Sequence, residues 1–98
     1  MPRPKRPAPR DYSQAWPTAR CESDVAEAVR LFAVALRREL GDRSTRQATE
    51  RTGVTHTVIA DILAGTSWPD AETIGKLETS LGVALWPTLS DGRYPGSP

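Results

Sequence analysis

The stretch TRQATERTGVTHTVIADILAG, residues 45–65, contains two short amphipathic segments that meet at one glycine, Gly53. Ser44 begins an S-x-x-Q capping box, which predicts a helix that starts at Thr45. Gly53 should end this helix, because glycine adopts a left-handed backbone without a steric penalty. Thr55 is a favourable N-cap for a second helix, which should end at the glycine that closes the stretch. The stretch therefore predicts a helix, a tight turn and a second helix.

Further helices are predicted on both sides of this pair. A row of apolar residues at helical spacing predicts a helix over 25–40 with Asp24 as its cap, and a second row predicts a helix over 71–81 capped by Asp70. No stretch alternates as a strand does. We therefore expect an all-α chain, a compact bundle of four to five short helices. The side chains expected to face inward are Val25, Val29, Phe32, Leu36, Leu40, Ala48, Val54, Val58, Ile59, Ile62, Leu63, Ile74, Leu77 and Leu81.

The two ends of the 98-residue chain are poor in residues that could build a core. The first ten residues, MPRPKRPAPR, contain four prolines and four basic residues. We expect residues 1–20 to form a basic, proline-rich, flexible arm and residues 87–98 to form a flexible tail. The helical domain should cover 21–86, with its helix-turn-helix motif at 45–64.

Charge and composition narrow the class of protein. The formal net charge is only +1, but basic residues gather in 1–10 and 37–51, while acidic residues prevail from 52 onward. A basic flank on a neutral body favours a local anionic partner, and a solvated surface of mixed charge is the alternative. Cys21 is the only cysteine, which fits a reducing cytoplasm. No apolar run is long enough for a membrane span or a signal peptide, so we expect a cytoplasmic protein without a membrane partner.

The chain lacks a grouping of residues that predicts catalysis. His56 is the only histidine, and no histidine or cysteine spacing is typical of a metal site. Asp61 and Asp70 are not paired by any motif, and Asp70 already has a structural role as a helix cap. We therefore expect no enzyme activity, no metal, no cofactor and no small-molecule substrate.

The predicted helix pair meets the requirements of a helix-turn-helix that reads DNA. The first helix must be short, the turn tight, and the second helix apolar inside and small or hydrogen-bonding outside. Val54 is placed to anchor the turn in the core. The outward positions of the second helix carry short side chains, so a backbone could approach the floor of a groove: His56, Thr57, Ala60, Asp61 and Ala64.

The segment from about Leu36 to Leu85 resembles the repressor/Cro-type helix-turn-helix family, also called XRE-type. The matching elements, in order, are LRRELGDRS, STRQATERTGVT, TVIADILAG and WPDAETIGKLETSLGV. The resemblance implies a lambda-repressor-like fold and sequence-specific binding of double-stranded DNA as a homodimer. It implies a transcriptional regulator of bacterial or phage type, with repression as the expected role, that is cytoplasmic and associated with the nucleoid when bound to DNA.

The resemblance also implies roles for individual residues. The recognition helix, about 56–64, would lie in the major groove and contact bases through His56, Thr57, Ala60 and Asp61. The start of the first motif helix, the start of the recognition helix and the loop that follows it would contact the DNA backbone through Arg43, Ser44, Thr45, Arg46, Thr55, Thr66 and Ser67. Two roles are open for the basic arm: it could contact DNA, or it could be a solubilising end.

The sequence departs from the family pattern at three positions. Thr49 stands where alanine is usual, and Ala48 stands where leucine is usual. Asp61 stands where many members carry arginine. A carboxylate is repelled by phosphates but can accept from a cytosine amino group, and the alternative is that Asp61 pairs with a neighbouring arginine.

A second hypothesis keeps the fold but changes the function. The near-zero net charge and Asp61 also fit a protein–protein interaction module, or an antitoxin-like or accessory protein, with weak DNA binding. In that interpretation some of the tryptophans, Trp16, Trp68 and Trp86, would form a dimer or partner surface. The simpler reading of Trp68 and Trp86 is that they cover a small core.

Overall fold

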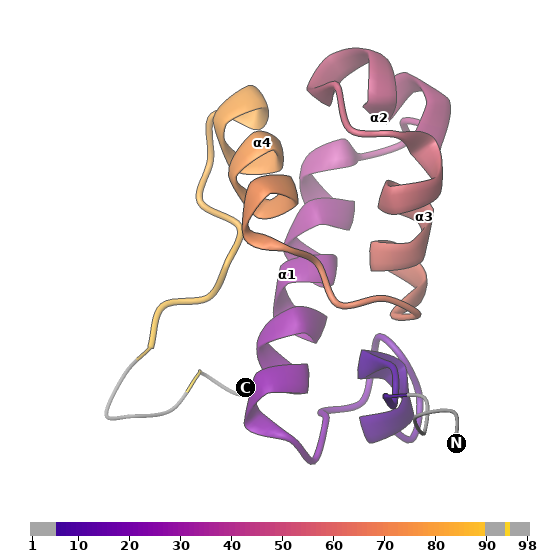
Figure 1. The fold of residues 1–98 in the computed structure, drawn as a ribbon, viewed down its shortest axis with the longest axis vertical. Helices are drawn as coiled ribbons and strands as arrows, with labels where there is room; N and C mark the ends of the chain where they lie inside the picture. Colours follow the sequence, from indigo (N-terminus) through magenta and orange to yellow (C-terminus); the bar gives the residue numbers. More distant parts are fainter. Residues whose placement is uncertain (1–5, 90–93, 95–98) are drawn as a thin grey trace, which may run out of the picture.

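The computed structural model describes residues 6–89 and 94. It contains a short 3₁₀ helix and four α-helices, and Figure 1 shows α1 as the long central element with α3 and α4 on either side. The prediction of an all-α bundle is confirmed. The elements are η1 (Pro9–Tyr12), α1 (Asp24–Leu40), α2 (Thr45–Thr52), α3 (His56–Ala64) and α4 (Ala71–Leu81).

The start of α1 differs from the prediction in two details. Its N-cap is Ser23, whose hydroxyl oxygen accepts from the Ala26 N–H at 3.3 Å, and Asp24 is the first helical residue. Val25, expected inside, is 56 % exposed. The reason is that this turn of α1 packs against the N-terminal segment, and that contact turns Ala26 and Glu27 inward instead of Val25.

The centre of the core is a hydrophobic cluster in which every α-helix takes part, while Cys21, Ala26, Ala28 and Val29 are buried outside this cluster. α1 supplies the largest share, and the buried members are Phe32, Ala33, Leu36, Leu40, Ala48, Val54, Ile59, Ile62, Leu77 and Leu85. Val58, also expected inside, is 36 % exposed at the rim of a shallow groove between α3 and α4. Only two side chains of α3, Ile59 and Ile62, are therefore fully buried.

The N-terminal segment, which we define as residues 6–22, packs against α1 and α3, whereas the composition had indicated a flexible arm. Pro9 and Cys21 are buried and Trp16 is half-buried, so the segment contributes apolar surface of its own. Figure 1 shows this indigo part of the chain folded beside the start of α1 and below the end of α3. Residues 1–5, the other part of the expected arm, lie outside the described residues.

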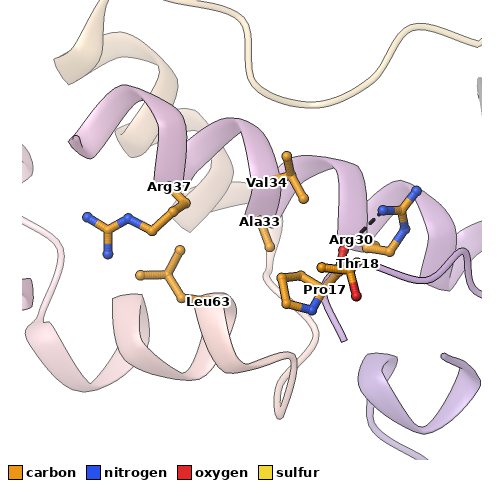
Figure 2. Close-up of a pocket in the computed structure, with 7 residues that line it drawn as sticks. All are labelled: Pro17, Thr18, Arg30, Ala33, Val34, Arg37 and Leu63. Carbon is orange, nitrogen blue, oxygen red and sulfur yellow. Dashed lines mark hydrogen bonds between the residues drawn. The ribbon is translucent and has the colours of Figure 1, made fainter. Parts of the chain in front are cut away.

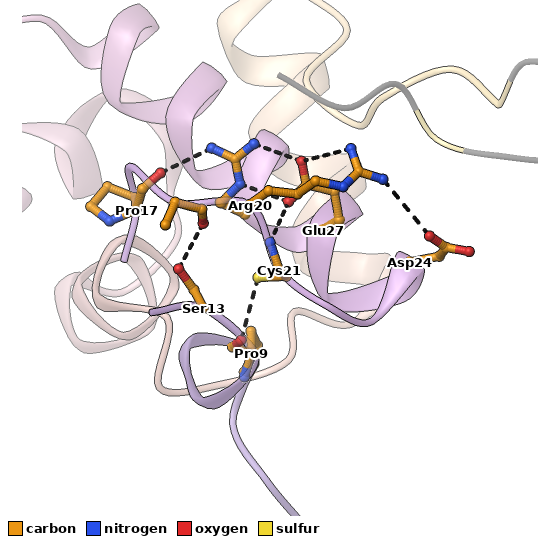
Figure 3. Close-up of polar contacts among 9 residues, drawn as sticks. Pro9, Ser13, Pro17, Arg20, Cys21, Asp24 and Glu27 are labelled. Carbon is orange, nitrogen blue, oxygen red and sulfur yellow. Dashed lines mark hydrogen bonds and ion pairs between the residues drawn. The ribbon is translucent and has the colours of Figure 1, made fainter. Parts of the chain in front are cut away.

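A buried ion pair fastens the N-terminal segment to α1 (Figure 3). The Glu27 carboxylate is fully buried and accepts from Arg30 Nε at 2.7 Å and Nη2 at 2.6 Å. It also accepts from the Cys21 N–H at 2.9 Å, and Arg30 Nη1 donates to the Pro17 carbonyl at 3.1 Å. Burial alone raises the pKa of Glu27, but the hydrogen bonds from Arg30 and Cys21 outweigh it and hold the pKa below its usual value.

The chain after α4 returns to the core through Glu78. The carboxylate of Glu78 accepts from the backbone N–H groups of Leu85 at 2.7 Å and Trp86 at 3.0 Å. Leu85 is buried, and the Trp86 ring lies 5.8 Å from the Phe32 ring. Most of the tail expected at 87–98 lies outside the described residues.

Candidate nucleic-acid interface

The turn between α2 and α3 is fixed by a backbone hydrogen bond, by the side chain of Thr52 and by the buried side chain of Val54. Gly53 has a φ of 76°, and its N–H donates to the Thr49 carbonyl at 2.8 Å. The Thr52 hydroxyl donates to the Ala48 carbonyl at 2.8 Å and accepts from the Val54 N–H at 3.2 Å. Val54 is 6 % exposed, so it anchors the turn in the core as predicted. The relation between the two helices is therefore well determined.

The two faces of α3 differ sharply. The inner face is fixed by Ile59 and Ile62, which are completely buried. On the outer face His56, Thr57 and Ala60 are exposed, as the sequence had predicted for residues that read DNA. Packing within the chain does not require these three side chains.

Asp61, the fourth base-contact candidate, has a local partner. It is half-buried, and the Thr66 hydroxyl lies 3.4 Å from its Oδ1 and 3.3 Å from its backbone carbonyl. Within 6–89 and 94, no arginine or lysine lies within ion-pairing distance of the Asp61 carboxylate. The structure thus pairs Asp61 with Thr66, and the alternative of an arginine partner is not observed.

The start of α2 offers backbone donors to an anion. Ser44 is occupied by its capping box, because its hydroxyl accepts from the Gln47 N–H at 3.2 Å and its own N–H donates to the Gln47 side chain at 2.9 Å. The N–H groups of Thr45 and Arg46 have no acceptor in the described part of the chain. Backbone donors at a helix start bind anions well. Ser44 therefore fixes the geometry of the helix start, and the N–H groups of Thr45 and Arg46 are the donors that remain for an anion.

Basic side chains surround the start of α2. Arg46 is exposed and has no ion-pair partner among the described residues. Arg43 is also exposed, and its guanidinium makes only two long contacts of 3.5 Å with the carbonyls that end α1. Arg37 Nη2 donates to the Gly41 carbonyl at 2.6 Å and fixes the loop between α1 and α2. The start of α2 is therefore flanked by two exposed guanidinium groups, those of Arg43 and Arg46.

The remaining backbone-contact candidates lie at the two ends of α3. Thr55 occupies the N-cap position, but its side chain makes no capping hydrogen bond, so its hydroxyl is exposed at the helix start. Thr66 is exposed and Ser67 half-buried in the loop after α3. The Thr66 N–H donates to the Asp61 carbonyl at 3.0 Å, which ties this loop to the end of the helix.

The three tryptophans are all half-buried and engaged inside the chain. Trp16 Nε1 donates to the Leu63 carbonyl at 2.9 Å, and Trp68 Nε1 donates to the Pro7 carbonyl at 2.8 Å. Trp86 packs on the core. The hypothesis that some of them form a dimer or partner surface stays a prediction. Sequence reasoning had no signal for the contact between Trp16 and the end of α3.

A cavity of about 450 Å³ lies between α1 and α3 (Figure 2). Its walls include aliphatic groups from both helices and the segment before them; the lining residues are Pro17, Thr18, Arg30, Ala33, Val34, Arg37 and Leu63. Arg30 is committed to Glu27 and Pro17. Among the lining residues Thr18 carries a hydroxyl group, but none of them is a histidine or a carboxylate that could act as its general base. No group of residues suited to a metal ion occurs in the described part of the chain.

A protein-family model described as helix-turn-helix matches residues 34–85, which is more than half of the 98-residue chain. The chain belongs to this family, which is of Cro/C1 type and XRE-like. Its four helices form the lambda-repressor-like all-α fold, and the family is one of DNA-binding transcription regulators. Searches of curated proteins and of solved structures found no match. No helix in the described residues is long and apolar enough to cross a membrane.

Proposed function

We propose that this protein is a sequence-specific transcriptional repressor that places α3 in the major groove of its operator. The observation that carries the proposal is the division of α3 into a completely buried inner face and an exposed outer face of short side chains. Packing explains the inner face but not the outer one. An outer face of this kind lets the helix backbone approach base edges.

Each residue of the outer face has a suitable chemistry. His56 and Thr57 can donate or accept hydrogen bonds at base edges. The Ala60 methyl group is small enough to contact a thymine methyl. The Asp61 carboxylate can accept from a cytosine amino group while the Thr66 hydroxyl stays beside it.

The DNA backbone would be held on both sides of α3. At the start of α2, the free N–H groups of Thr45 and Arg46 and the side chains of Arg43 and Arg46 would contact phosphates, with Ser44 supporting them as the cap. At the ends of α3 the hydroxyl-bearing contacts would be Thr55, Thr66 and Ser67. Such contacts set position and affinity but carry no sequence information.

The protein would act as a homodimer on two half-sites. Dimers of helix-turn-helix proteins bind half-sites about one turn of DNA apart, roughly 34 Å, so the operator would be an inverted repeat. Occupation of such a site next to a promoter would block transcription. Sedimentation with and without operator, together with a reporter gene that carries the operator, tests the dimer and the direction of regulation.

The central experiment is a selection of random DNA duplexes with the full chain, followed by fluorescence anisotropy at two salt concentrations. We expect one enriched sequence and salt-sensitive binding. If no sequence is enriched, the proposed function is wrong, and a stoichiometric protein partner without DNA affinity would favour the interaction-module hypothesis.

Two variants assign roles to the surface. Arg46→Ala should weaken binding to every sequence alike and reduce the slope of log K against log salt by about 1, because Arg46 would contact phosphate. Thr57→Ala should leave that slope unchanged and reduce the preference for the operator by about tenfold, as expected for a lost base contact. Equal effects of the two variants would contradict these roles.

A further inference from the structure

The C-terminal end of α3 is held by a distant part of the chain. Its Asp61 and Ile62 carbonyls accept from the next residues, at Thr66 and Gly65, as at many helix ends. The Leu63 carbonyl instead accepts from Trp16 Nε1 at 2.9 Å. Beyond the helix, the Gly65 carbonyl accepts from the Arg10 N–H at 3.0 Å.

Within the part of the chain that the structure describes, the other helices that end in a left-handed glycine lack such a contact. The Gly53 N–H donates to Thr49 at the end of α2, and the Gly82 N–H donates to Glu78 at the end of α4. In the described residues, no atom other than those of the glycine and its two chain neighbours lies within 4 Å of the place where a Cβ would stand on either glycine. A Cβ on Gly65 would stand 2.5 Å from Trp16 Cε2. The Trp16 ring therefore lies directly on the end of α3.

This contact matters because it holds the end of α3 that lies away from the turn with α2. In α3 only Ile59 and Ile62 are fully buried, and the Leu63 side chain is half-buried beside the cavity of Figure 2. The Trp16 side is firmly held, because Arg30 donates to the neighbouring Pro17 carbonyl and is itself paired with buried Glu27. Trp16 thus connects the end of α3 to a fixed point on α1.

We propose that Trp16 is a positioning residue for DNA recognition, which sets the tilt of α3 through the Leu63 carbonyl and Gly65. This inference rests on the proposed function. If it holds, the N-terminal segment takes part in DNA recognition, although it precedes residues 34–85, which the family model matches. Small misplacements of groups that must meet a target are costly, so the end of α3 should influence how Ala60 and Asp61 meet the base edges.

The test compares Trp16→Phe with Trp68→Phe in the full chain. Each variant keeps an aromatic ring and the charge of the protein, and each removes one indole N–H that donates to a backbone carbonyl. Trp16 donates to the Leu63 carbonyl, which belongs to α3, whereas Trp68 donates to the Pro7 carbonyl, which does not. The probes are the duplex enriched by the wild-type chain and a scrambled duplex of equal composition, at one salt concentration, with the folded fraction measured by circular dichroism.

We expect Trp16→Phe to lower the preference for the enriched duplex about fivefold, the size of one hydrogen bond, with unchanged affinity for the scrambled duplex. Trp68→Phe should keep the wild-type preference. Amide hydrogen exchange without DNA should also be faster in the last turn of α3 in Trp16→Phe than in Trp68→Phe. Equal preferences or equal exchange in the two variants would overturn the inference.

A second pair keeps the test decisive if Trp16→Phe is partly unfolded. Gly65→Ala pushes the Trp16 ring away from α3, and Gly82→Ala has the same left-handed backbone without a neighbour to displace. Gly65→Ala alone should lower the preference, and a similar loss in Gly82→Ala would overturn the inference. A wild-type chain that enriches no duplex contradicts the proposed function, whereas an enriched duplex that all variants prefer alike contradicts only the role of Trp16.

Discussion

The helix-turn-helix pair and the N-terminal segment are stabilised by different kinds of interaction. In α2 and the turn, each capping bond joins residues at most four positions apart, such as Ser44 with Gln47 and Gly53 with Thr49. In the N-terminal segment the decisive bond joins residues 47 positions apart, Trp16 and Leu63. Local bonds form wherever the helix forms, whereas the distant ones require that the whole domain is folded. Substitutions at residues that hold the N-terminal segment against α1 or α3 should therefore cost more than the loss of a single local cap.

The largest effect is expected from Glu27→Gln. Glutamine keeps the shape of the side chain but removes the carboxylate charge that faces the Arg30 guanidinium, which is only 3 % exposed. Breaking a buried ion pair on one side costs about 3 kcal/mol or more of unfolding free energy. Urea unfolding followed by circular dichroism measures it. Glu22→Gln, at an exposed position of the same segment, should cost less than about 0.5 kcal/mol.

The ion pair between Glu27 and Arg30 also predicts that the free energy of unfolding depends on pH. The folded pKa of Glu27 lies below its ordinary value of 4.5, so the stabilisation is complete above that value and is lost as the pH falls through the lower folded value. The stability difference between wild type and Glu27→Gln should therefore be constant near neutral pH and shrink in acid. A difference that stays constant down to about pH 2 would show that the pair is not linked to protonation of Glu27.

A smaller effect is expected from a comparison of the glycines that end the two motif helices. Alanine at either Gly53 or Gly65 costs about 1 kcal/mol for its positive φ. Gly65→Ala adds a collision with the Trp16 ring, and overpacking of this kind costs about 1–3 kcal/mol more. Thermal and urea unfolding of both variants measure the gap. If both variants lose the same free energy of unfolding, the Trp16 ring can move away from the end of α3 with little loss of stability.

Features that depend on a few neighbouring residues could be predicted from the sequence. Ser44, Gly53 and Asp70 determine helix ends through bonds within four residues, and the structure has each where it was expected. The exposed positions His56, Thr57 and Ala60 on α3 followed from helical periodicity. Their role toward DNA stays a prediction.

Features that depend on distant parts of the chain could not be predicted. Val25 and Val58 fit the apolar pattern of their helices, but both side chains are exposed. The pattern shows which face of a helix is apolar, but not how far along that face another element covers it. Glu27 and Arg30 have the spacing of an ordinary surface pair, and the sequence gives no sign that both are buried against the segment that contains Pro17 and Cys21. The contact of Trp16 with α3 crosses the boundary of the family match, so no motif could indicate it.

The smallest effect concerns the starts of α2 and α3. It compares an N-cap residue that makes a capping hydrogen bond with one that only occupies the N-cap position. Ser44 and Thr55 both occupy N-cap positions, but only the Ser44 hydroxyl accepts a capping bond, from the Gln47 N–H. Ser44→Ala should cost about 1 kcal/mol, because it exposes an unpaired helix donor. Thr55→Ala should cost less than about 0.5 kcal/mol, because no capping bond is lost. Urea unfolding at pH 7 measures both, and a Thr55→Ala loss as large as that of Ser44→Ala would mean that the Thr55 hydroxyl caps α3 in solution and is not available to a phosphate.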